Sequence, residues 1–298
     1  MKIDRILEEQ RPCFSFEFFP PKTPEGEQNL ERALQELRHD EPQFVSVTYG
    51  ALGSTRERTI DITKHIKKDL GLEAMAHFTC VGATREELIA TLGEMREAGI
   101  ENVLALRGDP PEGEEVWTQT EGGLQYSTEL AQLISSEFPF SVGAACFPEV
   151  HPEAESPESD LRFTKAKIDS GVGFLITQLF FDNDLYFDFV TRAREAGIDV
   201  PIIPGIMPVT NFKQIKRITG LCDATIPPEF ERELADRQED PEALTELGVA
   251  YATLQCADLL ARGAPGIHFY TLNKSPATRA ILAALRAARP WDRALAPV

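Results

Sequence analysis

The sequence predicts a single (β/α)8 TIM barrel, an α/β fold, with an extra helical section before the last strand. Eight short apolar runs alternate with longer amphipathic stretches along the 298 residues. Most of the runs lack strict polar alternation, which is typical of parallel strands covered on both faces. Parallel strands need crossover connections, and eight such units fit one closed barrel spanning residues 1–298. An open doubly wound sheet is the alternative.

The expected elements follow each other in strand–helix order. The strands cover the apolar runs 14–19, 44–49, 74–80, 102–106, 140–147, 174–181, 200–206 and 266–272. The helices cover the stretches 25–38, 57–70, 85–98, 124–137, 158–170, 185–196, 211–219, the extra section 228–261 and the last helix 274–288. Several helices are followed by a glycine typical of a left-handed C-cap, namely Gly99, Gly171, Gly197 and Gly263.

The composition narrows the class of protein. With 30 basic and 48 acidic residues the formal net charge is −18, which disfavours binding to nucleic acid or to anionic lipid. The N-terminus lacks an apolar signal core and no apolar run is long enough for a membrane helix, so we expect a cytoplasmic protein. The five cysteines form no C-x-x-C pair, which favours free thiols.

Glycine-rich nucleotide motifs are missing, because the chain has neither G-x-G-x-x-G after a strand nor G-x-x-x-x-G-K-[ST]. The stretch 109–123 is rich in Pro, Glu and Gly and predicts a long loop leaving the fourth strand. Active sites of such barrels are built from the loops at the carboxyl ends of the strands. The polar residues at those ends are therefore the candidate site residues.

Glu17 is the clearest catalytic candidate in the sequence, since phenylalanines surround it at the end of the first strand. Burial in apolar company is expected to raise its pKa and make it a proton donor near neutral pH. The alternative is a structural carboxylate paired with Lys22 or another cation. Asp109 ends the fourth strand, but an Asp before two prolines is often only a turn residue.

Two other polar residues, His151 and Gln178, each admit two interpretations. His151 could bind a metal with Glu149 or Glu153, although a hydrogen-bonded loop histidine is the expected case and we predict no metal site. Gln178 interrupts an apolar strand, so it needs either a bound polar ring or a hydrogen bond in the core. His77 and His268 are expected to point into the barrel lumen.

Seven segments along nearly the whole chain carry a family resemblance. They are FSFEFFPPK (14–22), FVSVTYG (44–50), LALRGD (104–109), FPEVHPEA (147–154), ITQLFFD (176–182), IPGIMP (203–208) and HFYTLN (268–273). With these segments in register, the chain resembles the bacterial methylenetetrahydrofolate reductases, flavoproteins that make methyltetrahydrofolate.

The resemblance implies a barrel that holds FAD without a Rossmann domain. It implies a ping-pong reaction in which NADH, or NADPH, gives hydride to the flavin and leaves. Methylenetetrahydrofolate then accepts the hydride on its one-carbon unit, in a step that feeds methionine synthesis. The electron chemistry belongs to the flavin, and the protein supplies position and protons. A homo-oligomer is expected.

The resemblance also implies roles for individual residues. The Glu17 position is the general acid that helps to open the folate ring, and the Asp109 position contacts the pterin near the flavin. Gln178, Gln214, Tyr270 and Lys274 fall at further substrate positions. The flavin positions are Thr48, His77, Arg107, Gly108, Asp109, Tyr126, Phe147, His151, Asp160 and Lys167.

The chain departs from the family pattern at several positions. Phe147 stands where a Tyr is common, and Phe163 and Ala166 replace an Asn and an Arg, which leaves Lys167, with Lys165, for the pyrophosphate. Ile218 stands where an aromatic ring can stack on the nicotinamide. Lys274 replaces an Arg and loses its bidentate fork. Because the chain stops soon after the last helix, we expect neither a regulatory domain nor inhibition by S-adenosylmethionine.

Two rival functions remain from the residues alone. Glu17 and Asp109 could be the carboxylate pair of a barrel hydrolase, and with His151 they could hold the metal of a lyase. The other rival is a non-catalytic barrel that serves as a partner module. Polar groups converge at seven strand ends, which favours a ligand-binding barrel over a non-catalytic partner module.

Overall fold

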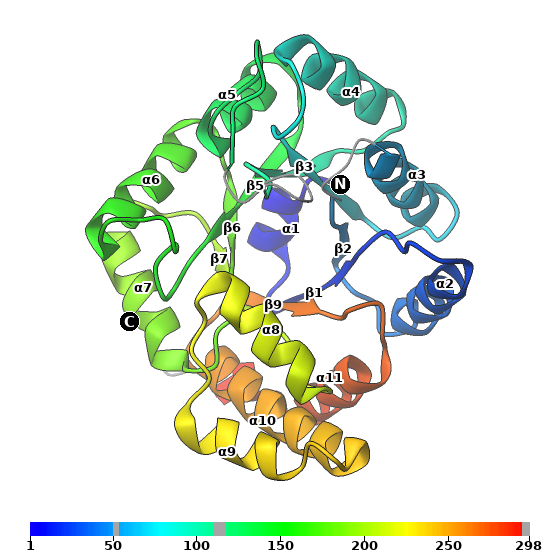
Figure 1. Cartoon of the computed structure of the whole chain (residues 1–298), viewed down its shortest axis with the longest axis vertical. Coiled ribbons are helices and arrows are strands. Elements are labelled where there is room, and N and C mark those ends of the chain that lie inside the picture. The colour runs from blue at the N-terminus through cyan, green and yellow to red at the C-terminus, as the bar shows by residue number, and fades with distance from the viewer. Residues whose placement is uncertain (50–53, 110–116, 294–298) are drawn as a thin grey trace.

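The computed structural model confirms the barrel. It describes residues 1–49, 54–109 and 117–293, and within them nine parallel strand segments form a nearly closed barrel surrounded by helices (Figure 1). The sheet order is β7-β6-β5-β4-β3-β2-β1-β9-β8. The first strand pairs with both the second and the last, so the two ends of the chain meet in the barrel wall.

The strands are shorter than the apolar runs that predicted them. Their bounds are β1 Cys13–Phe18, β2 Phe44–Val47, β3 Ala74–Thr79, β4 Asn102–Leu106, β5 Ser141–Cys146, β6 Phe174–Thr177, β7 Ile202–Ile203, β8 Gly205–Ile206 and β9 Gly266–Tyr270. The single strand expected at 200–206 is wrong, because it is split at Pro204, which has no N–H to give to a ladder. The β7 segment pairs with β6, whereas β8 pairs with β9.

The expected helices are present with small shifts at their ends. Their bounds are α2 Pro24–Arg38, α3 Ser54–Lys68, α4 Arg85–Glu97, α5 Ser127–Glu137, α6 Pro157–Asp169, α7 Asn183–Glu195, α8 Phe212–Cys222, α9 Pro228–Asp236, α10 Pro241–Ala261 and α11 Pro276–Ala288. The extra helical section is therefore two helices, and the Asp240 carboxylate caps the second by accepting from the backbone N–H of Ala243 at 3.1 Å. The four predicted C-cap glycines all have positive φ, between 73° and 100°.

A short first helix that the sequence did not predict closes the amino-terminal end of the barrel. Helix α1, Ile3–Glu9, lies within the ring of strands (Figure 1). Its Ile3, Ile6 and Leu7 pack in an apolar cluster with Phe44 and Phe174 of the strands. Seven residues are too few for an amphipathic period to stand out in the sequence. Because α1 seals this end, only the carboxyl ends of the strands are left open for a ligand.

Two expectations from composition can be compared with the structure. No helix within residues 1–49, 54–109 and 117–293 is long and apolar enough to cross a membrane. All five cysteines are free thiols. The loop predicted at 109–123 lies partly outside the described residues. Its described end joins the start of α4 through an antiparallel bridge between Gly123 and Thr84.

Candidate active site

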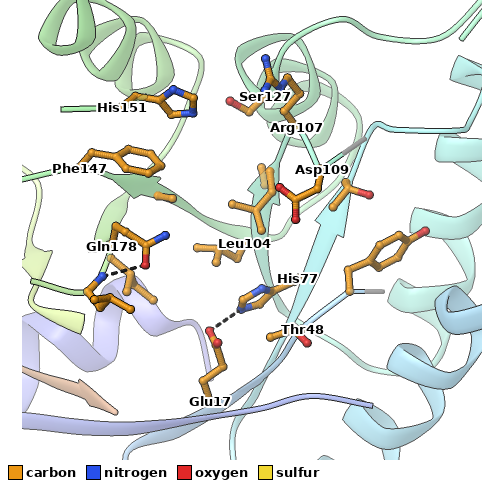
Figure 2. A pocket seen from close by; sticks show the side chains of 18 of the residues that line it. Glu17, Thr48, His77, Leu104, Arg107, Asp109, Ser127, Phe147, His151 and Gln178 are labelled. Atoms are coloured by element: carbon orange, nitrogen blue, oxygen red, sulfur yellow. Dashed lines mark hydrogen bonds and ion pairs between the residues drawn. The ribbon is translucent and has the colours of Figure 1, made fainter. Parts of the chain in front are cut away.

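A cavity of about 460 Å³ opens at the carboxyl ends of the strands, within the size range of small-molecule sites (Figure 2). Residues from β1 to β9 and the loops after them line it. The cavity brings together eleven of the residues singled out from the sequence, namely Glu17, Thr48, His77, Arg107, Gly108, Asp109, Phe147, His151, Lys167, Gln178 and Tyr270. They come from all around the barrel, so the fold gathers segments that are far apart in the chain.

Four predicted site residues do not line this cavity. Tyr126 directly precedes Ser127, which does line it, and Asp160 is buried on α6 below His151 and Lys167 in the same charge network. Gln214 lies in the first turn of α8. Lys274 lines a neighbouring cavity with Lys22.

Glu17 lies at the inner end of the cavity, between two histidines. Its Oε2 is 3.3 Å from Nε2 of His77 and 3.5 Å from Nε2 of His268 (Figure 2). Burial alone would raise the pKa of Glu17, but the charge of His77 and the hydrogen bond with His268 outweigh it and lower the pKa to about 2. The raised pKa expected from the sequence is therefore wrong for this arrangement of side chains, and Lys22 is not the partner of Glu17.

His268 stands behind Glu17 rather than at the cavity wall. It is fully buried, and its Nδ1 lies 2.7 Å from the hydroxyl of Ser15. Its ring stacks on Phe44, with ring centroids 6.0 Å apart. The expectation of lumen-facing histidines thus holds for both: His77 lines the cavity, and His268 lies beneath it in the lumen, between Phe44 and the carboxylate of Glu17.

Two buried polar atoms face the cavity without a regular hydrogen bond. The hydroxyl of Thr79 has none, and Nε2 of His77 has only its 3.3 Å ion-pair contact with Glu17. Buried polar groups are almost always satisfied in native structures, so the hydroxyl of Thr79 calls for a ligand with a hydrogen-bonding edge. Thr79 was not predicted as a site residue, because threonine is common in β-strands and nothing distinguishes it there from a structural residue.

The other end of the cavity carries a half-buried lysine. The ammonium group of Lys167 donates to the carbonyl of Ala145 at 2.8 Å, and burial lowers its pKa. Nearby, the rings of Phe147 and His151 pack edge to face with centroids 4.6 Å apart. Burial lowers the pKa of His151 as well, so the imidazole favours its neutral form there. This end offers one cation and one apolar wall.

The carboxylates around His151 are directed to other partners. Glu153 holds Arg107 in a bidentate ion pair with contacts of 2.6 and 2.7 Å, and the Glu149 carboxylate accepts from the backbone N–H of Thr225 at 3.0 Å. Within the part of the chain that the structure describes, no group of three or more His, Cys, Asp and Glu is placed to hold a metal ion. The metal-lyase alternative thus finds no support in this geometry.

Gln178 and Tyr270 complete the wall opposite His77. The Gln178 side-chain oxygen accepts from the neighbouring backbone N–H of Leu179 at 2.8 Å, while the side chain faces the cavity (Figure 2). The Tyr270 hydroxyl donates to the carbonyl of Thr177 at 2.6 Å, which leaves its ring as the surface toward the cavity. Met207 and Ile218 add apolar surface from the segment that follows β8.

Comparison with known proteins gives one family match over most of the chain. The family profile for methylenetetrahydrofolate reductase matches residues 2–286. The 5,10-methylenetetrahydrofolate reductase of Escherichia coli is 41% identical over 267 residues, which cover 90% of this chain and 88% of that protein. A protein of Arabidopsis thaliana named methylenetetrahydrofolate reductase (NADH) 1 is 39% identical over 292 residues, which cover 94% of this chain and 49% of that protein.

The lengths of these relatives differ. The chain spans about half the length of the plant relatives it matches, and 88% of the bacterial ones. Among solved structures, a protein of Clostridium thermocellum described as binding two copies of 5-methyl-5,6,7,8-tetrahydrofolic acid aligns with a TM-score of 0.62 at 16% identity, covering 97% of this chain and 99% of that one. This likeness is one of fold.

Proposed function

The chain belongs to the methylenetetrahydrofolate reductase family, and we propose that it reduces 5,10-methylenetetrahydrofolate to 5-methyltetrahydrofolate with NADH through bound FAD. The names of the plant relatives support NADH as the donor. Supply of the methyl group for methionine synthesis is the proposed use of the product. The observation that carries the proposal is the pair of Glu17 and His77, whose Oε2 and Nε2 atoms are 3.3 Å apart at the floor of a cavity in a chain of this family.

The residues at the cavity fit a flavin. The unpaired hydroxyl of Thr79 and the side chain of His77 suit the hydrogen-bonding edge of a planar ring system, and Thr48 lines the same cavity. At the other end, the half-buried ammonium group of Lys167 suits a phosphate group, and the neutral imidazole of His151 can donate a hydrogen bond to it. When bound, the flavin would accept hydride from the nicotinamide and pass it to the folate.

Glu17 and His77 act as one acid in this proposal. A carboxyl whose pKa is about 2 would not hold a proton at neutral pH, but that low value depends on charge at the neighbouring imidazoles. Because Oε2 of Glu17 and Nε2 of His77 are 3.3 Å apart and both side chains line the cavity, a proton held by the pair lies within reach of a bound substrate. The pair would place that proton on the ring nitrogen of the substrate whose bond to the methylene carbon breaks. The hydride goes to the methylene carbon, so protons and electrons balance.

Other residues position the substrate. The free amide group of Gln178 and the carboxylate of Asp109 lie on the cavity wall, where they would pair with the pterin. The ring of Tyr270 and the side chains of Met207 and Ile218 would cover its apolar faces. Lys274, in the neighbouring cavity, would attract the carboxylate tail of the folate. Gln214 is proposed to contact the same tail.

The test is the anaerobic visible spectrum of the purified full-length protein. NADH is added first and 5,10-methylenetetrahydrofolate second. The expected result is a flavin absorption band that bleaches with NADH and returns with the folate, which reports both half-reactions separately. A protein that stays colourless after incubation with FAD would overturn the proposal and revive the carboxylate-pair hydrolase. A band that bleaches but never returns would locate the failure in the folate step.

A further inference from the structure

Arg107 lines the cavity, and its ion-pair partner is an exposed carboxylate (Figure 2). The guanidinium group donates to both oxygens of Glu153 at 2.6 and 2.7 Å, which uses two of its five N–H groups. The side chain of Glu153 is 59% exposed, whereas that of Arg107 is 25% exposed. Exposed ion pairs are screened by water and hold two long side chains only weakly. The pair with Glu153 therefore does not by itself fix where the other N–H groups of Arg107 point.

A tryptophan ring from the loop after β4 gives Arg107 a second contact. The guanidinium group lies over the ring of Trp117, with its central carbon 5.4 Å from the ring centroid, within the range of cation–π interactions. Arginine suits this contact, because its planar guanidinium group can stack on an aromatic face and still donate hydrogen bonds from its edge. Arg107 is thus held by two different groups, the carboxylate of Glu153 and the ring of Trp117.

Trp117 is the better anchored of these two partners. It is half-buried and packs against the main hydrophobic core, whereas the Glu153 side chain is exposed. The indole N–H of Trp117 is buried and finds no acceptor among the described residues, so the ring is held by packing and by its contact with Arg107. A buried donor without a partner costs stability, and such costs persist where function requires the arrangement. The described end of this loop is also fixed to α4, because the backbone N–H of Arg85 donates to the carbonyl of Gly122 at 2.9 Å.

We propose that Trp117 is a positioning residue, which holds the guanidinium group of Arg107 in place at the cavity through a cation–π contact, an inference that rests on the proposed binding of FAD. Arg107 is the residue that would touch the flavin, and Trp117 acts only through it. An indole ring has few side-chain torsions and presents a rigid face when it packs on a core. The arginine is then preorganised, so less conformational entropy is lost when a ligand binds. The described end of the loop at 109–123 thereby supports the cofactor site without lining the cavity.

The experiment measures the affinity for FAD in four full-length proteins that form a double-mutant cycle. They are the unchanged chain, Trp117→Leu, Arg107→Met and the double variant. Each is freed of flavin and titrated with FAD, with binding read from the quenching of flavin fluorescence. Trp117→Leu removes the aromatic face, so the dissociation constant of FAD is expected to rise about two- to thirty-fold. In the Arg107→Met background the same substitution should have almost no effect, because no cation is left for the ring to hold.

A conservative variant and a matched control separate positioning from general damage. Trp117→Phe keeps an aromatic face and should retain most of the affinity for FAD. Trp291→Leu makes the same substitution at a tryptophan that packs on Phe14, with ring centroids 5.9 Å apart, and should leave that affinity unchanged. Urea denaturation checks that each variant is folded. If Trp117→Leu does not fold, Trp117→Met takes its place in the cycle, because methionine fills irregular space without an aromatic face.

Three results would count against the contact with the guanidinium group. An unchanged dissociation constant in Trp117→Leu would overturn the inference. An equal rise with and without the Arg107 side chain would overturn it too, because the loss would then come from the loop as a whole. Equal weakening by Trp117→Phe and Trp117→Leu would show that the aromatic face is irrelevant, and this comparison decides when Arg107→Met binds FAD too weakly to titrate. If the unchanged chain binds no FAD, the proposed function itself falls, which is a distinct result.

Discussion

The two ends of the barrel differ in how their buried polar groups are satisfied. At the amino end, the side chain of Asn102 accepts from the backbone N–H of Ile3 at 2.8 Å and donates to Glu73 at 2.8 Å. At the carboxyl end, His77 and Thr79 each present a buried polar atom without a hydrogen bond. Six such atoms occur among the described residues, and none belongs to α1 or to the residues that α1 packs against.

The two ends of the barrel therefore have different roles: the amino end contributes to stability, and the carboxyl end binds the ligand. Each β/α unit contributes to both ends of the barrel. Helix α1 closes the amino end, whereas polar groups at the carboxyl end face a cavity where they can bind a ligand. Unsatisfied groups cost stability, so they persist where binding supplies their partners. Changes at the amino end should therefore alter folding alone, and changes at the carboxyl end should alter chemistry alone.

The largest expected effect is that of Glu17→Gln. The amide cannot donate the proton that opens the folate ring, so we expect the folate half-reaction to slow by about 10²- to 10⁴-fold. Reduction of the flavin by NADH needs no such proton and should keep its rate, which makes it the internal control. Stopped-flow absorbance measures the two half-reactions separately. Normal folate turnover in this variant would remove Glu17 from the mechanism.

Leu7→Ala tests the amino end. Leu7 is fully buried in the α1 cluster, and truncating such a side chain typically costs about 2–5 kcal/mol of unfolding free energy. Urea denaturation measures the loss, and Glu8→Ala, an exposed change in the same helix, is the control. The folded fraction should bind flavin as before. A large change in flavin affinity would contradict the division between the two ends.

Asp109→Asn tests the role of the carboxyl end in binding and chemistry. If its charge meets both the pterin and the flavin, its loss should weaken folate binding and change the rate of flavin reduction together. A hydrogen bond to a charged group contributes about 1.5–3 kcal/mol, so each effect should be roughly ten- to a hundred-fold. Folate titration and rapid-reaction kinetics give the two numbers. If neither moves, Asp109 is only the turn residue that its two prolines suggest.

The smallest effect is the acid sensitivity of the amino end. The hydrogen bond from Lys67 holds the pKa of Glu101 at about 2, below its ordinary value of 4.5. A carboxyl with a lowered pKa stabilises the fold above its unfolded pKa, and that contribution is lost as the pH falls from about 4.5 to about 2. Because Glu101 is half-exposed, the contribution should be about 1 kcal/mol or less.

Lys67→Met reveals that contribution. The unfolding free energy of the unchanged protein should fall more steeply between pH 5 and pH 2.5 than that of the variant. Flavin binding at neutral pH is the control and should be the same in both proteins. Parallel curves over this range would show that the ion pair of Lys67 and Glu101 adds nothing to stability.

The sequence predicted the architecture because hydrophobic period and strand–helix order are local properties. It did not predict the break at Pro204, since a proline within an apolar run reads as part of the strand until its neighbours on both sides are known. It did not predict α1 either, because the partners of its three apolar residues are far along the chain. Such features depend on contacts between distant segments.

For the site, the sequence predicted the positions of the residues better than it predicted their pKa values. Most of the expected residues line one cavity, as strand ends in a barrel must converge. The pKa of Glu17 was predicted with the wrong sign, because burial was visible from its phenylalanine neighbours whereas His77 and His268 were not. Gln214 and Lys274 lie outside that cavity, so their expected roles rest on the resemblance alone.

The position of α1 has a consequence for the order of folding. Helix α1 is synthesised before each of the strands described above. Its docking surface, however, includes side chains from Phe44 to Ile203, and that surface exists only when most of the barrel has been synthesised. Helix α1 therefore docks late, after most of the barrel has been synthesised. Its docking accompanies the closure of the barrel rather than the start of folding.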